Sequence, residues 1–406
     1  MLQDEPSSER GDGRARAEEA PIAPPPSGRI PNDRRGRPPS AERILVVRLG
    51  ALGDVLRTIP AVTALRALYP ASHLAWLVEP AAASAVRAAG CVDEIVVFPR
   101  GELVAALRSG RLLVLARQLR DFVRRLRARR FELALDFHGL AKSGLLAWLS
   151  GAPIRFGHAR GVARELSHVF ANRRVELPAP RVSRFDRNAA LVRALAPEQV
   201  RAVPDGPLLA PSADARARLE ARLAALGRGD AAGFVLIHPG SSAGAEHKRY
   251  APAAWSAVAA RLADAGFEVW IAAGSAAAER ALVEAIVSGC GGRAFAAPET
   301  PELDDLLALI ARARVFAACD SGPLHAASLV GVPVVQLLGP TDPVHNTPAA
   351  ASPWRRIHVP LPCSPCRRGC ADPACMRAIP PARVAEAIAD LAIGAEKASA
   401  AQGDAS

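Results

Sequence analysis

The chain has 406 residues, half of them hydrophobic and only 4% aromatic, and it carries a formal net charge of +11. This length corresponds to two or three domains with substantial cores. No uninterrupted apolar run reaches the roughly 18 residues of a membrane-spanning helix, and the N-terminus lacks the basic and then apolar pattern of a secretory signal. These features exclude a helical membrane protein, and we expect a soluble protein of the cytoplasm.

Two segments at the ends of the chain are predicted to be disordered tails, over residues 1–41 and 397–406. The first is rich in Pro, Gly, Arg and acidic residues, a composition that does not repay the entropy of ordering. Its seven Arg and seven acidic residues cancel. The excess positive charge therefore belongs to the folded body.

Much of that charge lies in residues 102–130, where nine Arg oppose only Glu102 and Asp121. Leu and Phe residues recur there at helical spacing, which predicts a basic amphipathic helix. Such a helix is suited to anionic lipid or to a phosphorylated acceptor. A solvated arginine-rich face explains the same pattern, and the sequence alone leaves both interpretations open.

From residue 43 onward, strand-like and helical segments alternate, which indicates a parallel sheet with crossover helices. The predicted strands are 44–47, 73–79, 94–98 and 132–137, and the helices begin near Asp54, Pro80, Glu102 and Lys142. Residues 151–200 are rich in Arg and Pro and are harder to place. The Pro-bearing stretch 201–207 is the predicted interdomain connection.

A second alternating series follows the connection. Its predicted strands are 234–237, 268–273, 315–319 and 334–338, and its helices are 251–266, one beginning near Ser275, one opened by Thr300, Pro301 and Glu302, and 380–394. Two open α/β units joined by one linker predict two Rossmann-like domains, over residues 42–203 and 204–396. Such sheets bind ligands beyond the carboxyl ends of their strands, so we expect two sites that face a central cleft.

The first candidate site follows the strand 44–47, at the loop that runs from Gly50 to Asp54. Gly50 and Gly53 permit a tight turn and a close approach of a ligand to the backbone. The spacing is not the dinucleotide fingerprint of Rossmann enzymes. For Asp54, a helix N-cap is the structural alternative to a role in chemistry.

The second candidate site combines two loops of the later series. Ser241, Ser242 and Lys248 follow the strand 234–237, where small hydroxyl residues and a point charge are suited to a diphosphate. Glu279 follows the next strand, where a carboxylate is able to bind ribose hydroxyls, or is simply a favourable acid in the first turn of a helix. The segment Asp320, Ser321, Gly322, Pro323, Leu324, His325 adds a helix N-terminus where a diphosphate is able to sit.

Together these stretches resemble glycosyltransferase family 9, the ADP-heptose:lipopolysaccharide heptosyltransferases, over roughly residues 43–390. The resemblance rests on ILVVRLGALGDVLRTIPAVTALRALYP, DFHGLAKSGLLAWLSGAPIRFG, IHPGSS with Lys248, and CDSGPLHAASLVGVPVVQLLGPTDP. It implies a GT-B fold, with the acceptor bound by the N-terminal domain and the nucleotide sugar by the C-terminal domain. It also implies inverting transfer from a β-linked nucleotide heptose to an α-linkage.

The resemblance implies a role for each candidate residue. Asp54 is the expected general base, which takes the proton of the attacking hydroxyl. The expected donor-binding residues are Ser241, Ser242, Lys248, Glu279, Asp320, Ser321, Gly322 and His325, and the expected acceptor-binding residues are Arg48, Gly53, Arg57 and Lys142. Because the chain has no D-x-D pair, we expect protein cations rather than a divalent metal to stabilise the departing diphosphate.

Four cysteines lie within thirteen residues, in the order Cys363, Cys366, Cys370 and Cys375. Four thiolates are able to form a closed, structural zinc site, and a metal suits a cytoplasmic chain better than two disulfides. Free or redox-active thiols are the alternative. No cofactor is expected for catalysis itself.

The leading hypothesis is a transferase that moves heptose from ADP-heptose to the inner core of lipopolysaccharide, on an anionic, lipid A-linked saccharide. We expect it in the cytoplasm, with peripheral contact to the inner membrane and without a nucleic-acid partner. The alternatives are a family member with another nucleotide sugar and envelope glycan, a module that binds sugar nucleotides without catalysis, and a basic nucleic-acid-binding protein with a metal at the cysteines. Few aromatic residues and no recognised nucleic-acid module weaken the last of these.

Overall fold

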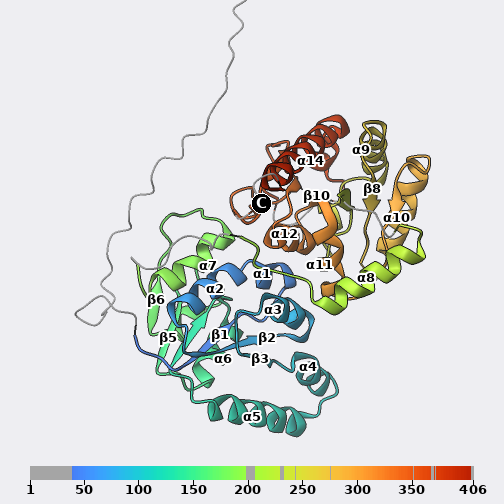
Figure 1. Cartoon of the computed structure of the whole chain (residues 1–406). Coiled ribbons are helices and arrows are strands. Elements are labelled where there is room, and N and C mark those ends of the chain that lie inside the picture. Colours follow the sequence, from blue (N-terminus) through green and yellow to red (C-terminus); the bar gives the residue numbers. More distant parts are fainter. Residues whose placement is uncertain are drawn as a thin grey trace, which may run out of the picture.

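The structure is a computed structural model that describes residues 39–197, 206–228, 233–242, 244–274, 276–350, 352–366, 370 and 372–403, with side chains up to residue 395. Most of the predicted N-terminal tail, residues 1–38, and residues 201–205 of the predicted connection lie outside this description. The described part is an α/β protein built on two parallel six-stranded sheets (Figure 1).

The first sheet has the strand order β3-β2-β1-β4-β5-β6. Its strands are β1 (Arg43–Val47), β2 (His73–Val78), β3 (Glu94–Val97), β4 (Leu133–Asp136), β5 (Ile154–His158) and β6 (Arg173–Val175). The helical elements of this unit are α1 (Leu52–Leu56), α2 (Ile59–Leu68), η1 (Pro80–Ala82), α3 (Ala83–Ala89), α4 (Arg100–Arg108), α5 (Leu112–Ala128), α6 (Ala141–Leu149), η2 (Ser167–Val169) and α7 (Arg184–Arg193).

The second sheet has the order β12-β11-β10-β7-β8-β9. Its strands are β7 (Phe234–His238), β8 (Val269–Ile271), β9 (Phe295–Ala296), β10 (Ala313–Cys319), β11 (Val334–Leu338) and β12 (Trp354–His358). The helical elements are α8 (Ala213–Ala225), η3 (Glu246–Lys248), α9 (Pro252–Asp264), α10 (Ala277–Gly289), α11 (Leu303–Arg312), α12 (Gly322–Val330), α13 (Ala374–Arg377) and α14 (Pro381–Gly403).

Helices cover both faces of each sheet, so the central strands are apolar on both sides. In β1, Ile44, Leu45, Val46 and Val47 are all fully buried, as expected of a parallel strand between two helical layers. On one face, Phe122 of α5 and residues of α6 pack against Leu45 and Val47. On the other face, the apolar core continues from α1 and α3 into α11 and α12 of the second unit.

Both sheets have the doubly wound strand order, in which the chain changes direction between the first and the fourth strand of the unit. The switch lies between β1 and β4 in the first sheet, and between β7 and β10 in the second. Ligands of open α/β sheets bind at such switch points, beyond the carboxyl ends of the strands. The segments that follow β1 and β10, which carry Asp54 and Asp320, therefore occupy the expected places.

All eight predicted strands are present, and the predicted two-sheet α/β architecture is confirmed. The predicted basic helix over 102–130 is two helices, α4 and α5, because the chain turns at Ser109 and at Gly110, whose φ is +67°. Glu302 rather than Thr300 is the N-cap of α11. None of the helices among the described residues is long and apolar enough to cross a bilayer.

The ends of the described chain differ from the predicted tail boundaries. Ala41 is buried, and the Tyr69 hydroxyl donates a hydrogen bond to the Pro39 carbonyl at 2.9 Å. Residues 39–41 therefore lie against the folded body, and the predicted boundary of the tail at residue 41 is wrong. At the other end, α14 continues past residue 396 to Gly403, and residues 404–406 lie outside the description.

Candidate active site

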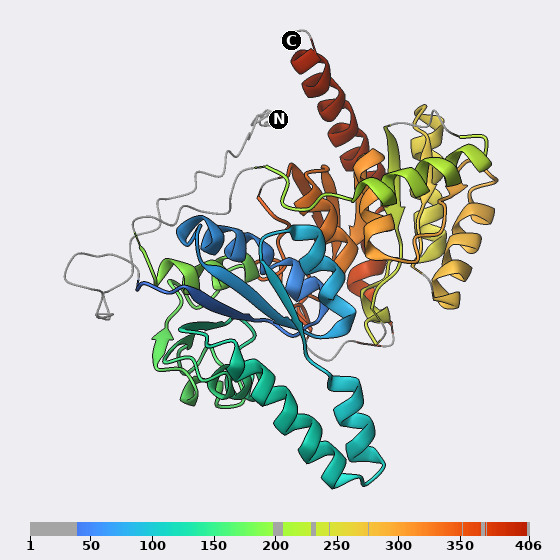
Figure 2. The same cartoon turned by 60° about the horizontal axis from the view of Figure 1, so that its bottom comes forward.

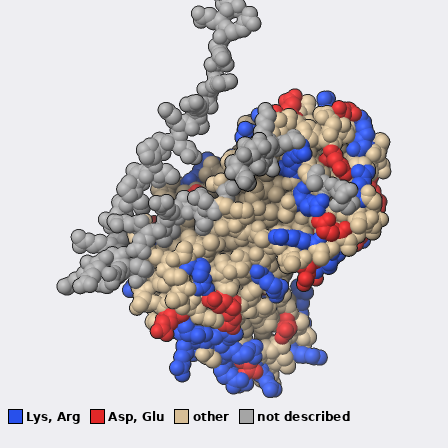
Figure 3. Space-filling view, in the orientation of Figure 1, with Lys and Arg blue, Asp and Glu red and all other residues tan. Residues whose placement is uncertain are grey.

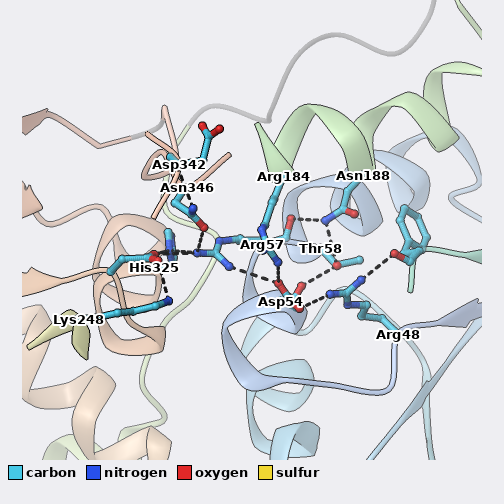
Figure 4. A network of polar contacts seen from close by, with 12 residues as sticks. Arg48, Asp54, Arg57, Thr58, Arg184, Asn188, Lys248, His325, Asp342 and Asn346 are labelled. Carbon is cyan, nitrogen blue, oxygen red and sulfur yellow. Dashed lines mark hydrogen bonds and ion pairs between the residues drawn. The ribbon is translucent and has the colours of Figure 1, made fainter. Parts of the chain in front are cut away.

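Asp54 lies within α1, directly after the central strand of the first sheet, and is surrounded by arginines (Figure 4). Its carboxylate is 2.6 Å from a guanidinium nitrogen of Arg48, 2.6 Å from one of Arg184 and 3.3 Å from one of Arg57. Ala51, not Asp54, is the N-cap of this helix. Capping therefore does not account for Asp54, and its carboxylate is held by positive charge instead.

The arginines determine the charge state of Asp54. Burial alone raises the pKa of a carboxyl group, but the charges of Arg48, Arg184 and Arg57 outweigh burial and lower the pKa of Asp54 to about 2. Arg48 is itself fixed, because it also donates a hydrogen bond to the Phe137 carbonyl at 2.8 Å. Asp54 is thus a rigidly oriented carboxylate at neutral pH.

Arg57 connects this cluster to the second sheet. Its guanidinium is 3.1 Å from the Asp320 carboxylate and 3.3 Å from the Asn346 side-chain oxygen, and it contacts the His325 ring. Asp320 follows β10, and His325 lies on α12. One side chain therefore joins the strand-end loops of the two units.

Asp320 is the centre of the second cluster. Its carboxylate accepts from Lys248 at 3.2 Å and is 3.4 Å from the His325 ring nitrogen. Burial opposes its ionisation, but His325, Arg57 and Lys248 hold its pKa well below the ordinary range. Burial and then the charge of Arg57 lower the pKa of His325 to about 4, so the buried imidazole is neutral at pH 7.

The backbones of the two units also approach each other at two glycines. A Cβ atom on Gly53 of α1 would stand 3.6 Å from the Cα of Gly322, the first residue of α12. The nine-residue helix α12 has Pro323 in its first turn, and the Ser321 hydroxyl before it is buried without a hydrogen-bond partner. Because a helix N-terminus favours anions, this close approach places an anion-binding element beside Asp54.

Glu279 reaches the same edge of the second sheet from α10. It accepts a hydrogen bond from the backbone of Gly274, after β8, at 2.8 Å. A Cβ atom on Gly240, after β7, would stand 2.5 Å from the Glu279 carboxylate. A side chain at Gly240 would displace this carboxylate, which lies across the carboxyl ends of two neighbouring strands.

Lys248 is the member of the adjacent cations His247, Lys248 and Arg249 that contacts Asp320. Arg249 instead donates to the Ser241 hydroxyl at 2.9 Å, and that hydroxyl donates to the Ala245 carbonyl. Ser241 therefore stabilises the conformation of its own loop. Ser242 is exposed. The structure brings Lys248, Asp320 and His325 together, with Ser321 and Gly322 next to them in the chain.

On the acceptor side, the structure brings Arg48, Gly53 and Arg57 around Asp54 but leaves Lys142 apart. The Lys142 ammonium is 3.2 Å from Glu79, a carboxylate that also binds Arg100 at 3.0 Å. A Cβ atom on Gly50 would lie 3.7 Å from Glu79. Lys142 is thus next to the loop after β1, but its partner is Glu79 rather than Asp54.

Several residues of the site were not identified from the sequence. Arg184 and Arg187 come from α7, in the segment 151–200 that was hard to place, and Asn346 follows β11. Arg187 is packed beside Gly139, and burial, with the charges of Arg48 and Arg184, lowers its pKa to about 10. One sequence signal for α7 is Ser183, whose hydroxyl accepts from the Asp186 backbone as a helix N-cap.

The four clustered cysteines, Cys363, Cys366, Cys370 and Cys375, are free thiols. Cys375 is buried, where burial raises its pKa, whereas Cys363 and Cys370 are exposed. Among the residues that the structure describes, no group of three or more His, Cys, Asp or Glu side chains is arranged to hold a metal ion. As placed, the cysteines do not form a four-ligand site, and zinc at this segment stays a prediction from spacing.

The model of glycosyltransferase family 9 (heptosyltransferase) matches residues 119–374. Lipopolysaccharide heptosyltransferase 1 of Pseudomonas aeruginosa is 29% identical over 338 residues, which cover 80% of this chain and 86% of that protein. Among solved structures, the family 9 glycosyltransferase of Veillonella parvula has a TM-score of 0.70 at 20% identity and covers 87% of this chain and 97% of its own. The E. coli heptosyltransferase WaaC with ADP has a TM-score of 0.66 at 21% identity, with coverages of 86% and 99%. The fold is GT-B as predicted, and the chain belongs to glycosyltransferase family 9, the heptosyltransferase family.

Proposed function

We propose that this enzyme transfers heptose, with inversion, from ADP-heptose to the inner core of lipopolysaccharide, at the cytoplasmic face of the inner membrane. The single observation that carries this proposal is the face-to-face placement of Asp54 and the cluster of Asp320, Lys248 and His325 at the switch points of two sheets. The choice of lipopolysaccharide as the acceptor is supported by the similarity to the lipopolysaccharide heptosyltransferase 1 of P. aeruginosa. The choice of an ADP-linked donor is supported by the similarity to E. coli WaaC, whose structure has been solved with ADP and with ADP-2-deoxy-2-fluoro heptose.

The donor would be held by the second unit, which we assign to residues 204–396. Lys248 and the N-terminus of α12, at Ser321 and Gly322, are positioned for the diphosphate, since both favour negative charge. Glu279 is positioned for the ribose hydroxyls, because it spans the ends of β7 and β8. Asp320 and His325 would then bind the donor sugar or the phosphate next to it.

The acceptor would be held by the first unit, which we assign to residues 42–203. Arg48, Arg57, Arg184 and Arg187 gather around Asp54, with Asp320 beside Arg57 and Asp136 near Arg48 and Arg187 as the other carboxylates. This excess of positive charge suits an acceptor that carries carboxylates or phosphates. Lys142 and the backbone at Gly53 extend the same side of the site.

The reaction then proceeds by direct displacement. The acceptor hydroxyl attacks the anomeric carbon, its proton passes to Asp54, and the bond from that carbon to the diphosphate oxygen breaks. ADP leaves with both bonding electrons, and Lys248 and the α12 N-terminus stabilise the charge. Attack opposite to a β-linked leaving group gives an α-linkage. Protein cations thus take the part that a divalent ion plays elsewhere.

A carboxylate with a pKa near 2 is a poor base in the resting enzyme. We expect the anionic acceptor to increase the basicity of Asp54, because its charged groups would draw the exposed Arg184 away from the carboxylate, while the buried Arg48 stays in place. The proton affinity of Asp54 would then rise only when the acceptor is bound. This coupling would also discourage attack by water before the acceptor arrives.

The donor assignment is tested by calorimetry in EDTA, with ADP-heptose as ligand and ADP, UDP and GDP as competitors. The proposal predicts metal-free binding with preference for the adenine nucleotide. Preference for UDP or GDP would preserve the fold and the role of Asp54 but would replace heptose by another nucleotide sugar. Binding to none of them would leave a module without this donor site.

A further inference from the structure

The hairpin of α4 and α5 projects from the first unit, away from the active site (Figure 2). Phe122 and Leu126, near the end of α5, are buried against the sheet. The tip of the hairpin is different, because Leu112 is 63% exposed and Leu113 is 88% exposed. Leu107 and Val114, on either side of the turn, are exposed as well. Exposed apolar side chains gathered at one turn in this way indicate an interaction site.

Positive charge accompanies this apolar tip. The hairpin carries exposed arginines at 108, 111, 117, 120, 124, 125, 127 and 130. The arginines at 117, 120 and 124 share one carboxylate, Asp121, at 3.7–3.9 Å. Figure 3 shows Lys and Arg side chains gathered over the part of the surface where Figure 1 places α4 and α5. The hairpin therefore keeps a large net positive charge.

A neighbouring helix adds exposed apolar side chains near the other end of α5. α6 packs beside α5, and Arg127 donates to the Leu149 carbonyl at 2.9 Å. On α6, Leu145 is exposed and Trp148 is 48% exposed. Tryptophan is favoured where a protein meets the boundary between lipid and water. Three adjacent helices thus present apolar side chains that the rest of the described chain does not cover.

We infer that this hairpin docks the enzyme on an anionic phospholipid bilayer. The leucines of the tip, with Trp148, would enter the boundary between headgroups and acyl chains, and the arginines would bind the lipid phosphates. Charge complementarity selects this partner. A nucleic acid would use the arginines but would leave the exposed leucines unexplained.

The position of the hairpin also suits such a role. α4 begins at Arg100, whose side chain binds Glu79 beside the loop after β1. Docking through the hairpin would therefore hold the first unit, which carries Asp54, at the membrane surface. This inference goes beyond the transfer reaction, and it rests on the proposed function for the inner membrane and the lipid-linked acceptor. Vesicle binding is measured without either substrate. A failure of the docking inference is therefore distinguishable from a failure of the proposed transfer reaction.

The test is flotation of the full-length protein with vesicles of phosphatidylcholine, with and without phosphatidylglycerol. We expect binding to the anionic vesicles only, and release by added salt. The double substitution Arg120→Gln and Arg124→Gln should weaken binding about fivefold for each arginine removed. The double substitution Leu112→Ser and Leu113→Ser should weaken it at least about tenfold.

Matched controls lie on the second unit. Leu226→Ser removes an exposed leucine next to α8, and Arg216→Gln with Arg355→Gln removes two exposed arginines; both variants should bind vesicles like the unaltered protein. Thermal unfolding of each variant checks that the fold is intact. Equal binding to neutral vesicles, no binding, or hairpin variants that bind like the controls would overturn the inference. So would self-association that depends on Leu113, or tighter binding to duplex DNA than to anionic vesicles.

Discussion

The Arg57 guanidinium and the Asp320 carboxylate form an ion pair at 3.1 Å between residues 263 positions apart in the chain. The two side chains are only 8% and 5% exposed. Because Arg57 also contacts Asp54, one guanidinium links the expected base of the first unit to the charge cluster of the second. Binding of either substrate at this point is therefore expected to alter the surroundings of the other.

Removal of one partner of this pair should destabilise the fold. Arg57→Met leaves Asp320 buried with fewer cations, and breaking a buried pair from one side costs about 3–5 kcal/mol. The measurement is urea unfolding followed by circular dichroism. Arg293→Met, which breaks the exposed pair with Asp264, is the control and should change the free energy of unfolding by at most about 1 kcal/mol. Equal effects of the two substitutions would show that the pair between the units does not stabilise the fold.

Asp54→Asn should abolish most of the turnover and leave the binding of the donor nucleotide unchanged. Loss of a general base lowers kcat by about 10²–10⁴, whereas the donor would be held by the other unit. ADP release and calorimetry with ADP measure the two properties separately. Asp264→Asn, on an exposed carboxylate of the second unit, is the matched control and should be fully active. A rate for Asp54→Asn within twofold of the unaltered enzyme would remove Asp54 as the base.

Acid should weaken the fold in part through Asp54. Its pKa falls from an ordinary 3.8 to about 2 on folding, so the ionised group stabilises the folded state above about pH 4, and this contribution is lost as the pH falls towards 2. The free energy of unfolding should therefore decrease more steeply between pH 4 and pH 2 in the unaltered protein than in Asp54→Asn. Parallel curves for the two proteins would contradict the arginine-stabilised carboxylate.

Lys248→Met should weaken binding of ADP. A hydrogen bond to a charged group contributes about 1.5–3 kcal/mol, so the Kd should rise about 10–100-fold. The neighbouring substitution His247→Asn is the control, since Lys248 and not His247 contacts Asp320. Calorimetry in EDTA measures both. An unchanged Kd for Lys248→Met would move the diphosphate away from this lysine.

The sequence sufficed for the parts of the fold that depend on local pattern. Each predicted strand is a short apolar run between helical segments, and this pattern survives because parallel strands are buried on both faces. Asp320 was identified because it follows such a run directly, and Asp54 because it ends the glycine-bearing loop after one. The turn at Gly110 was missed because the apolar spacing of α4 continues into α5 almost in phase.

Residues that reach the site through tertiary contacts could not be predicted in this way. Arg184 approaches Asp54 from α7, which lies 130 positions along the chain. Asn346 reaches Arg57 from the loop after β11. Lys142 shows the opposite case, since the family resemblance implied a place at the acceptor site but its side chain binds Glu79. The contacts of long side chains depend on the tertiary structure, and the spacing of residues in the sequence does not determine them.

The most direct test of the central claim is transfer from ADP-heptose to a lipid A-linked inner-core acceptor in EDTA, with the new linkage examined by NMR. We expect ADP release without a divalent metal, one α-linked heptose per ADP released, and loss of both in Asp54→Asn. A β-linked product, or transfer that begins only when a divalent metal is added, would contradict inverting catalysis by Asp54 and protein cations.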